Sequence, residues 1–281
     1  MIELLLCTDM DRTLIPNGMQ DEAKDARQSF AEFCSNPEVV LVYVTGRHLE
    51  LMQKAIEEYD LPQPDYAITD VGTRIYHQQK GEWHIMVEWD DAIHPPWTHI
   101  TDEQVFALLT GIDGLKPQEP EKQNIHKISF YADIEKLDET HCLATVATRL
   151  APLDVLTNLI WSIDETSQTG LLDILPPDAN KLCAIEFLQQ FLKCEDKAVV
   201  FAGDSGNDLQ VLASPIQSIL VANATEEVKQ QALELAIHNG NQQQFYQAEN
   251  LTDNDGNYSA GILQGVFHYL PGLKNSWHRK I

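Results

Sequence analysis

Short apolar runs alternate with segments of helical periodicity over the first and last parts of the chain. The apolar runs are too short for helices and are typical of strands buried in a parallel sheet. They cover residues 4–8, 39–44, 66–69, 198–202 and 218–221, the last of which we expect to be the final strand. Helices are predicted over 21–34, 48–59, 178–191, 225–237 and from 257 onward, with Asp178 as an N-cap. This alternation predicts an α/β fold with a doubly wound, parallel, Rossmann-like sheet as its core.

The middle of the chain has a different pattern, beginning with a hairpin signal around Gly81. The other predicted elements cover, in order, 74–77, 84–88, 102–110, 125–132, 135–150 and 154–163. These strands are expected to be mostly antiparallel, so the middle is predicted to be an inserted α+β cap domain. The expected division is a core domain over 1–79, a cap domain over 80–171 and the rest of the core domain over 172–281.

Polar residues follow three of the apolar runs. Asp9 and Asp11 come after the first run, Thr45 after the second, and Asp204 and Asp208 after the fourth. The carboxyl ends of parallel strands meet at one edge, where open α/β sheets bind ligands. On an extended chain, residues two apart point to the same side, so Asp9 and Asp11 are expected to converge. Close carboxylates repel each other unless a cation or a shared proton lies between them.

This set of residues supports phosphoryl transfer. Oxygen ligands suit Mg²⁺, which we predict to be held by Asp9, Asp11, Asp204 and Asp208. Asp9 would attack phosphorus, and Asp11 would protonate the leaving oxygen and later deprotonate a water. Lys181, at the start of a helix facing the same edge, would neutralise the phosphoryl oxygens together with the Thr45 hydroxyl and the backbone N–H groups that follow it.

Several of these residues also allow a plain structural interpretation. Lys181 alone would more often be a solvated residue, and Thr45 could simply cap the end of a strand. Asp208 could cap the following helix or orient Lys181. Arg47 could be a surface residue, and the segment 70–72 could be a turn.

The composition excludes several classes of partner. A net charge of -24 argues against nucleic acid and anionic membranes, and no apolar run reaches the length of a membrane span. The N-terminus lacks a signal-peptide pattern and the five cysteines are scattered, which favours a cytoplasmic location. Neither a P-loop nor a dinucleotide-binding glycine motif occurs.

The motifs resemble those of haloacid dehalogenase superfamily phosphatases over the whole chain. Residues 9–13 look like the first motif, 45–47 the second, Lys181 the third and 203–208 the fourth, in the order of the branch with a large α/β cap. Such proteins often carry a small residue or Asn where this chain has Arg12. The resemblance implies phosphate or substrate contacts for Thr13, Thr45, Gly46, Arg47, Lys181 and Asn207.

Within that branch, four segments are similar to sucrose-phosphate and mannosylfructose-phosphate phosphatases. They are residues 70–73, 127–131, 173–176 and 258–265. The similarity implies Mg²⁺-dependent hydrolysis of a disaccharide monophosphate such as sucrose 6-phosphate, the last step in making a compatible solute. Mannosylfructose phosphate and glucosylglycerol phosphate are the alternative substrates. Substrate contacts are expected from Asp70, Gly72 and Lys127.

Two rival interpretations stay open. A phosphohexomutase of the same fold would have to keep its phosphorylated intermediate from water. A non-catalytic domain that docks onto a sugar-phosphate synthase would be marked by loss of Asp9 or Lys181, and both are present. Docking on the upstream glycosyltransferase does not exclude catalysis, and the last helix is a candidate surface for it.

Overall fold

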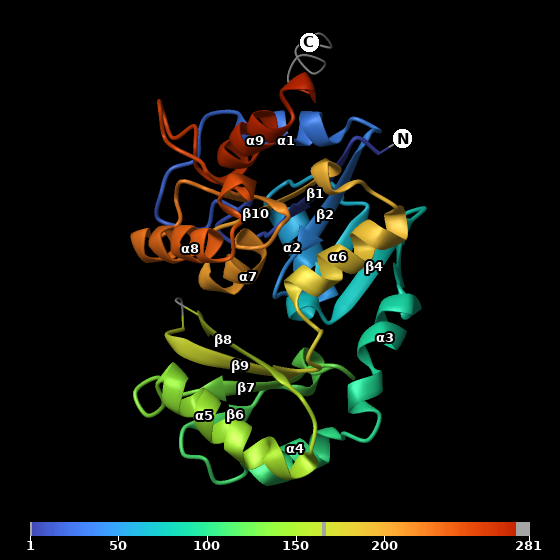
Figure 1. Cartoon of the computed structure of the whole chain (residues 1–281), viewed down its shortest axis with the longest axis vertical. Coiled ribbons are helices and arrows are strands. Elements are labelled where there is room, and N and C mark those ends of the chain that lie inside the picture. The colour runs from blue at the N-terminus through green and yellow to red at the C-terminus, as the bar shows by residue number, and fades with distance from the viewer. Residues whose placement is uncertain (1, 165–166, 274–281) are drawn as a thin grey trace.

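The computed structural model describes residues 2–164 and 167–273, and its helices and strands form a larger part that carries both ends of the described chain and a smaller part beside it (Figure 1). The strands of the larger part are β1 (Leu4–Thr8), β2 (Val39–Val44), β3 (Tyr66–Thr69), β4 (Arg74–Gln79), β5 (Glu82–Ile85), β10 (Val199–Gly203), β11 (Gln217–Leu220) and β12 (Phe245–Gln247). Its helices are α1 (Ala26–Cys34), α2 (Leu49–Glu58), α3 (Val87–Ile93), α6 (Lys181–Leu192), α7 (Leu209–Leu212), α8 (Glu226–His238) and α9 (Tyr258–Tyr269).

The larger sheet has eight strands in the order β12-β11-β10-β1-β2-β3-β4-β5. Its first six strands pair in parallel, and β4 and β5 add an antiparallel hairpin at one edge. Residues of β1 are buried on both faces, with Leu4 and Leu6 in one apolar cluster and Leu5 and Cys7 in the other. Burial on both sides explains why the run is apolar throughout.

Helices cover both faces of this sheet. Those on one face, α1, α2 and α9, contribute Phe30, Met52 and Ile262 to its cluster. The opposite cluster takes Ile185 from α6 and Leu212 from α7. The doubly wound parallel core predicted from the sequence is therefore confirmed. Among the described residues, none of the helices has both the length and the apolar character needed to cross a bilayer.

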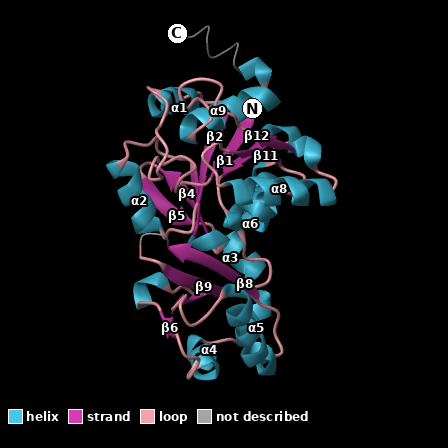
Figure 2. Ribbon diagram, turned by 90° about the vertical axis from the view of Figure 1, so that its left-hand side faces the viewer, coloured by secondary structure: helices cyan, strands magenta, loops and turns pink. Residues whose placement is uncertain are grey.

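The smaller part is an antiparallel sheet covered by two helices on its far side (Figure 2). Its elements are α4 (Asp102–Leu109), β6 (Leu115–Pro117), β7 (Ile128–Ala132), α5 (Glu139–Leu150), β8 (Asn158–Asp164) and β9 (Thr169–Leu175), with strand order β6-β7-β9-β8. Phe130 and Leu172 pack against Val146 of α5. The sheet faces the core, and β8 contacts the turn Gly206–Asp208, so the predicted α+β cap is confirmed.

Some boundaries differ from the expectation. Strand β5 lies beyond residue 80 yet belongs to the larger sheet, and β9 runs past residue 171 yet belongs to the smaller one. The division at 80 and 171 thus cuts through both sheets, and we propose edges after Ile93 and Leu175, because Trp89 and Ile93 of α3 pack in the core. Strand 218–221 was wrongly expected to be the last, because β12 adds one more parallel strand. The helix expected from residue 21 begins only at Ala26, since Asp25 is left-handed with φ 59°.

Candidate active site

The site lies where three neighbouring strands end. In the sheet, β1 lies between β10 and β2, and Thr8 pairs with residues of both. Asp9 follows β1 directly and Asp204 follows β10 directly. Lys181 is the first residue of α6, whose N-cap is Asn180 rather than the expected Asp178, because the Asn180 side chain accepts the N–H of Cys183.

Lys181 is the hub of the site. Its Nζ donates to Asp9 Oδ1 at 2.8 Å, to Asp208 Oδ1 at 2.7 Å and to Asn207 Oδ1 at 2.9 Å. The side chain is 3% exposed. Burial opposes the charged ammonium, but Asp208 and Asp9 outweigh it and raise the pKa of Lys181 above its ordinary value. The structure thus brings together four residues expected from the sequence, and Lys181 is a buried cation instead of a solvated side chain.

Asp208 orients Lys181, one of the two structural roles that the sequence left open, and its other oxygen closes the capping box of the turn Gly206–Asp208 instead of capping α7. Its Oδ1 accepts from Lys181, and its Oδ2 accepts the N–H groups of Asp204 at 3.1 Å and Ser205 at 3.2 Å. A Cβ at Gly203 would lie 2.7 Å from this carboxylate. Glycine at 203 therefore leaves room for Asp208, whose oxygens are largely committed to protein donors.

The side chains of Asp9, Asp204 and Asp208 form a buried cluster whose carboxylate oxygens lie within 4.8 Å of one another. Burial, together with the neighbouring carboxylates, raises the pKa of Asp9 well above its usual range and that of Asp204 to about 7. Asp204 Oδ1 accepts the Thr13 hydroxyl at 2.8 Å. Within the described residues, Asp204 Oδ2 is buried and accepts no hydrogen bond. Carboxylates that repel one another and leave an oxygen unsatisfied are suited to a divalent cation.

Asp11 does not converge with Asp9 as the spacing led us to expect. The strand ends at Thr8, and Asp11 instead forms a backbone bridge with Ile15, so the alternation of an extended chain no longer applies. Its carboxylate accepts from the Arg47 guanidinium at 2.6 and 2.7 Å and from Asn17 Nδ2 at 2.8 Å. The Asp11 side chain, which the sequence assigned to the metal, thus lies outside the three-aspartate cluster.

The segment after β2 lies on the same edge. Thr45 is buried, and its Oγ1 accepts the N–H of Arg47 at 3.1 Å. A Cβ at Gly46 would meet nothing within 4 Å, so the backbone there faces open space. The guanidinium of Arg47 turns to Asp11 and is not a solvated surface group. Of residues 45–47, Arg47 therefore contacts Asp11, while Thr45 and Gly46 follow β2, the strand beside β1.

Asp70 and Gly72 form a turn at which core and cap meet. Asp70, Val71 and Gly72 all have positive φ, at 51°, 62° and 99°. A Cβ at Gly72 would lie 2.3 Å from the backbone of Asn180, so this turn packs closely on the start of α6. Asp70 Oδ1 lies 3.1 Å from Nζ of Lys127 in the cap, and both side chains are buried. The turn interpretation fits Gly72, while the pair Asp70–Lys127 joins the two parts of the molecule.

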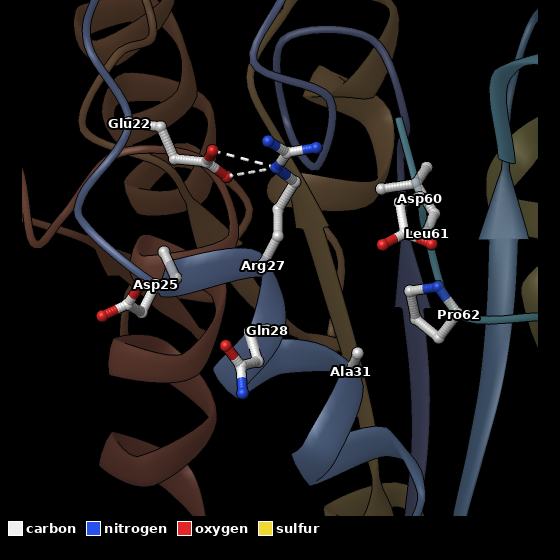
Figure 3. Close-up of a pocket in the computed structure, with 9 residues that line it drawn as sticks. Glu22, Asp25, Arg27, Gln28, Ala31, Asp60, Leu61 and Pro62 are labelled. Carbon is white, nitrogen blue, oxygen red and sulfur yellow. Dashed lines mark hydrogen bonds and ion pairs between the residues drawn. The ribbon is translucent and has the colours of Figure 1, made fainter. Parts of the chain in front are cut away.

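A separate surface pocket of about 620 Å³ lies at the start of α1 (Figure 3). It is lined by Glu22, Arg27 and Asp60 among others, and Arg27 is held there by Glu22 at 2.9 Å. None of the predicted site residues lines it. We therefore place the candidate active site at the sheet edge and not in this pocket.

The chain matches the family model for sucrose-6F-phosphate phosphohydrolase over residues 2–270. It belongs to the sucrose-6F-phosphate phosphohydrolase family. The resemblance seen in the motifs is thereby confirmed, and so is the class of enzyme, a phosphoric monoester hydrolase acting in sugar metabolism.

Known proteins similar to this phosphohydrolase support the assignment. A putative HAD-like hydrolase of Nitrosococcus oceani is 47% identical over 269 residues, which is 96% of this chain and 72% of that protein. Probable sucrose-phosphatase 2 of Arabidopsis thaliana is 28% identical, and the match covers 96% of this chain but only 60% of that protein. The structure of the Synechocystis sp. PCC6803 sucrose-phosphatase, in complex with sucrose and phosphate, has a TM-score of 0.76 and 26% identity, covering 96% of this chain and 98% of that one.

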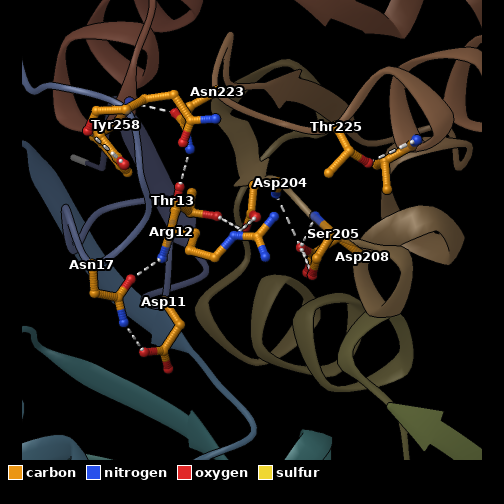
Figure 4. A network of polar contacts seen from close by, with 12 residues as sticks. Asp11, Arg12, Thr13, Asn17, Asp204, Ser205, Asp208, Asn223, Thr225 and Tyr258 are labelled. Atoms are coloured by element: carbon orange, nitrogen blue, oxygen red, sulfur yellow. Dashed lines mark hydrogen bonds and ion pairs between the residues drawn. The ribbon is translucent and has the colours of Figure 1, made fainter. Parts of the chain in front are cut away.

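Sequence reasoning missed part of the phosphohydrolase site. Figure 4 shows Asn17 and Asn223 on either side of the residues that follow Asp11. Asn17 Oδ1 accepts the N–H of Arg12 at 2.8 Å, and Asn223 Nδ2 donates to the Arg12 carbonyl at 2.6 Å. Asn223 in turn accepts the N–H of Tyr258 at 2.9 Å. No local pattern marks two asparagines in loops so far apart, because only the fold brings them together.

Proposed function

We propose that this phosphohydrolase hydrolyses a disaccharide monophosphate such as sucrose 6-phosphate, using Mg²⁺ and an aspartyl-phosphate formed on Asp9. The contact that carries the proposal is the hydrogen bond from buried Lys181 to Asp9. It fixes a carboxylate at the edge of the sheet beneath the cap and places a permanent positive charge beside it. A nucleophile that must approach an anionic phosphoryl group needs such a charge nearby.

Mg²⁺ fits this site, with Asp9 and Asp204 as the carboxylates that would hold it. The buried, unsatisfied Asp204 Oδ2 supports this assignment, and the oxygens of Asp208 are taken up by Lys181 and by backbone N–H groups. The side chain of Asp11 is left out of the ligand set, because Arg47 holds it. When bound, the ion would neutralise negative charge on the phosphoryl oxygens.

In the first step, an oxygen of Asp9 forms a bond to phosphorus while the bond from phosphorus to the sugar oxygen breaks. Asp11 gives its proton to that leaving oxygen. In the second step, a water attacks phosphorus, Asp11 takes the water's proton, and the bond to Asp9 breaks to release phosphate. Lys181, the Thr45 hydroxyl and the backbone at Gly46 stabilise the charge on the phosphoryl oxygens. The acid step requires Asp11 to loosen its pair with Arg47 as substrate enters.

The remaining predicted residues are proposed to orient other side chains of the site or to contact the substrate. Thr13 orients Asp204, and Asn207 orients Lys181, through the contacts described above. Asp70 and Lys127 are proposed to meet the sugar, since they lie where the cap joins the core. The enzyme is proposed to act in the cytoplasm on the product of an upstream glycosyltransferase, with which it could form a complex through α9. The five free cysteines fit a reducing compartment.

The test is phosphate release with Mg²⁺ from a panel of sucrose 6-phosphate, mannosylfructose phosphate, trehalose 6-phosphate, glucosylglycerol phosphate and hexose monophosphates. Asp9→Asn keeps the shape of the side chain and should abolish release, while Asp91→Asn, an exposed control, should not. Fast release from one disaccharide phosphate supports the proposal. Broad, slow release contradicts the disaccharide assignment, and no release from folded protein contradicts catalysis altogether.

A further inference from the structure

Arg12 has a backbone conformation that an arginine adopts at a cost. Its φ is 61°, in the left-handed region, where glycine or asparagine is more easily accommodated. Asn17 holds its N–H and Asn223 holds its carbonyl oxygen, so the conformation is fixed from both sides. A strained backbone that its neighbours hold in place often marks a functional residue, which points to a role for the Arg12 side chain.

The side chain of Arg12 reaches into the aspartate cluster. Its Nε lies 3.3 Å from Asp204 Oδ2, the same buried oxygen that accepts no hydrogen bond within the described residues (Figure 4). The Arg12 side chain is 25% exposed, so one end of it borders solvent. The guanidinium thus stands beside the oxygen that we assign to Mg²⁺.

We propose that Arg12 competes with Mg²⁺ for Asp204 and thereby makes metal binding depend on a phosphate group in the site. The inference rests on the metal site of the proposed function. When Asp9, Asp204 and Asp208 are ionised, they carry three negative charges against two positive ones from Lys181 and Arg12. A divalent ion turns this net -1 into net +1, which is unfavourable without an anion.

A phosphate dianion relieves that excess of positive charge. Mg²⁺ and phosphate are therefore expected to bind cooperatively, and each must strengthen the other by the same factor. Without Arg12, the cluster would bind Mg²⁺ well on its own, and the cooperation would shrink. The guanidinium moved away from Asp204 stays at the solvent border of the site, where it can face the phosphate.

The experiment is a calorimetric Mg²⁺ titration at pH 8, without and with inorganic phosphate, on wild type, Arg12→Asn and Arg12→Lys. Asparagine tolerates the left-handed backbone, and lysine keeps the charge. Arg27→Gln, which removes an arginine paired with Glu22 outside the site, is the matched control. Melting curves in EDTA verify that each variant is folded. Asp204→Asn tests the metal site itself.

Wild type should bind Mg²⁺ about 10-fold more tightly with phosphate than without it. Arg12→Asn should bind Mg²⁺ about 10-fold more tightly than wild type when phosphate is absent, and phosphate should then change its affinity by less than about 3-fold. If Asp204→Asn loses Mg²⁺ but Arg12→Asn binds it no better than wild type, the inference is overturned while the metal site stands. If Asp204→Asn and wild type bind Mg²⁺ equally, the metal site of the proposed function fails.

Discussion

Arg47 holds the Asp11 carboxylate by two hydrogen bonds, from Nε to Oδ2 at 2.7 Å and from Nη2 to Oδ1 at 2.6 Å. Partial burial would raise the pKa of Asp11, but the bonds and charge of Arg47, aided by Asn17, outweigh it and lower that pKa. An ionised Asp11 can accept a proton from water, but it carries no proton to donate to the leaving oxygen. Arg47 therefore sets the balance between the two proton transfers proposed for Asp11.

Replacing Arg47 should move the pH dependence of turnover. Arg47→Gln removes the hydrogen bonds and the charge that lower the Asp11 pKa, so this pKa should rise. The water-activating step needs ionised Asp11 and fails as pH falls through its pKa. The acidic limb of the kcat profile should thus move to higher pH, and less so in Arg47→Lys. If the acidic limb of the Arg47→Gln profile lies at the same pH as in wild type, Asp11 is not the base.

Removing Lys181 should destabilise the metal-free fold. Lys181→Met leaves the buried carboxylates of Asp9 and Asp208 without their cation, which is expected to cost about 3–5 kcal/mol at neutral pH. The pKa of Asp9, already raised by burial, then rises further, so the folded state binds a proton that the unfolded state has lost, and stability recovers as pH falls toward 5. Urea unfolding in EDTA at two pH values measures this, with exposed Lys54→Met as the control. An equal loss at both pH values would contradict the account.

The strands that carry the site were predictable because each is an apolar run bounded by polar residues. The runs at 39–44 and 66–69 correspond to β2 and β3 residue for residue. Strand β12 was missed because its three residues lie in a Gln-rich stretch with no periodicity, and only pairing with β11 makes it a strand. The start of α1 was misjudged because the apolar spacing continues through Asp25, whose backbone is left-handed.

The site was predictable as a set of residues and less so as a set of contacts. Asp9, Lys181 and Asp208 meet because the fold brings strand ends and a helix start together, as the motif order indicated. The pairing of Asp11 with Arg47 was not predictable, since it depends on where β1 ends and on how the next loop turns. The contact between Arg12 and Asp204 spans most of the chain and leaves no local pattern.

Metal-free enzyme should lose stability as pH rises through neutrality. Burial and neighbouring carboxylates raise the pKa of Asp204 to about 7, far above its unfolded value. A carboxylate with a raised folded pKa stabilises the fold below that pKa, and this contribution is lost as pH rises through it. In EDTA the melting temperature should therefore fall between pH 5.5 and 8.5, and less in Asp204→Asn. Mg²⁺ should restore stability at high pH. An identical pH dependence in Asp204→Asn would refute this origin.

Two glycines of the site should respond differently to replacement by alanine, one through stability and the other through phosphate binding. A Cβ at Gly203 would lie 2.7 Å from the Asp208 carboxylate, so Gly203→Ala must displace Asp208 and should destabilise the fold by about 1–3 kcal/mol. A Cβ at Gly46 meets nothing within 4 Å, so Gly46→Ala should leave stability within about 0.5 kcal/mol of wild type. The added methyl would instead occupy the space proposed for the phosphoryl group, raising both KM and the inhibition constant of inorganic phosphate. Gly272, which is also open and lies outside the site, is the matched control, and Gly272→Ala should change neither stability nor phosphate binding. Urea unfolding and inhibition by phosphate, measured on all three variants, separate the change in stability from the change in phosphate binding. If Gly46→Ala binds phosphate as tightly as wild type, the phosphoryl group does not approach Gly46.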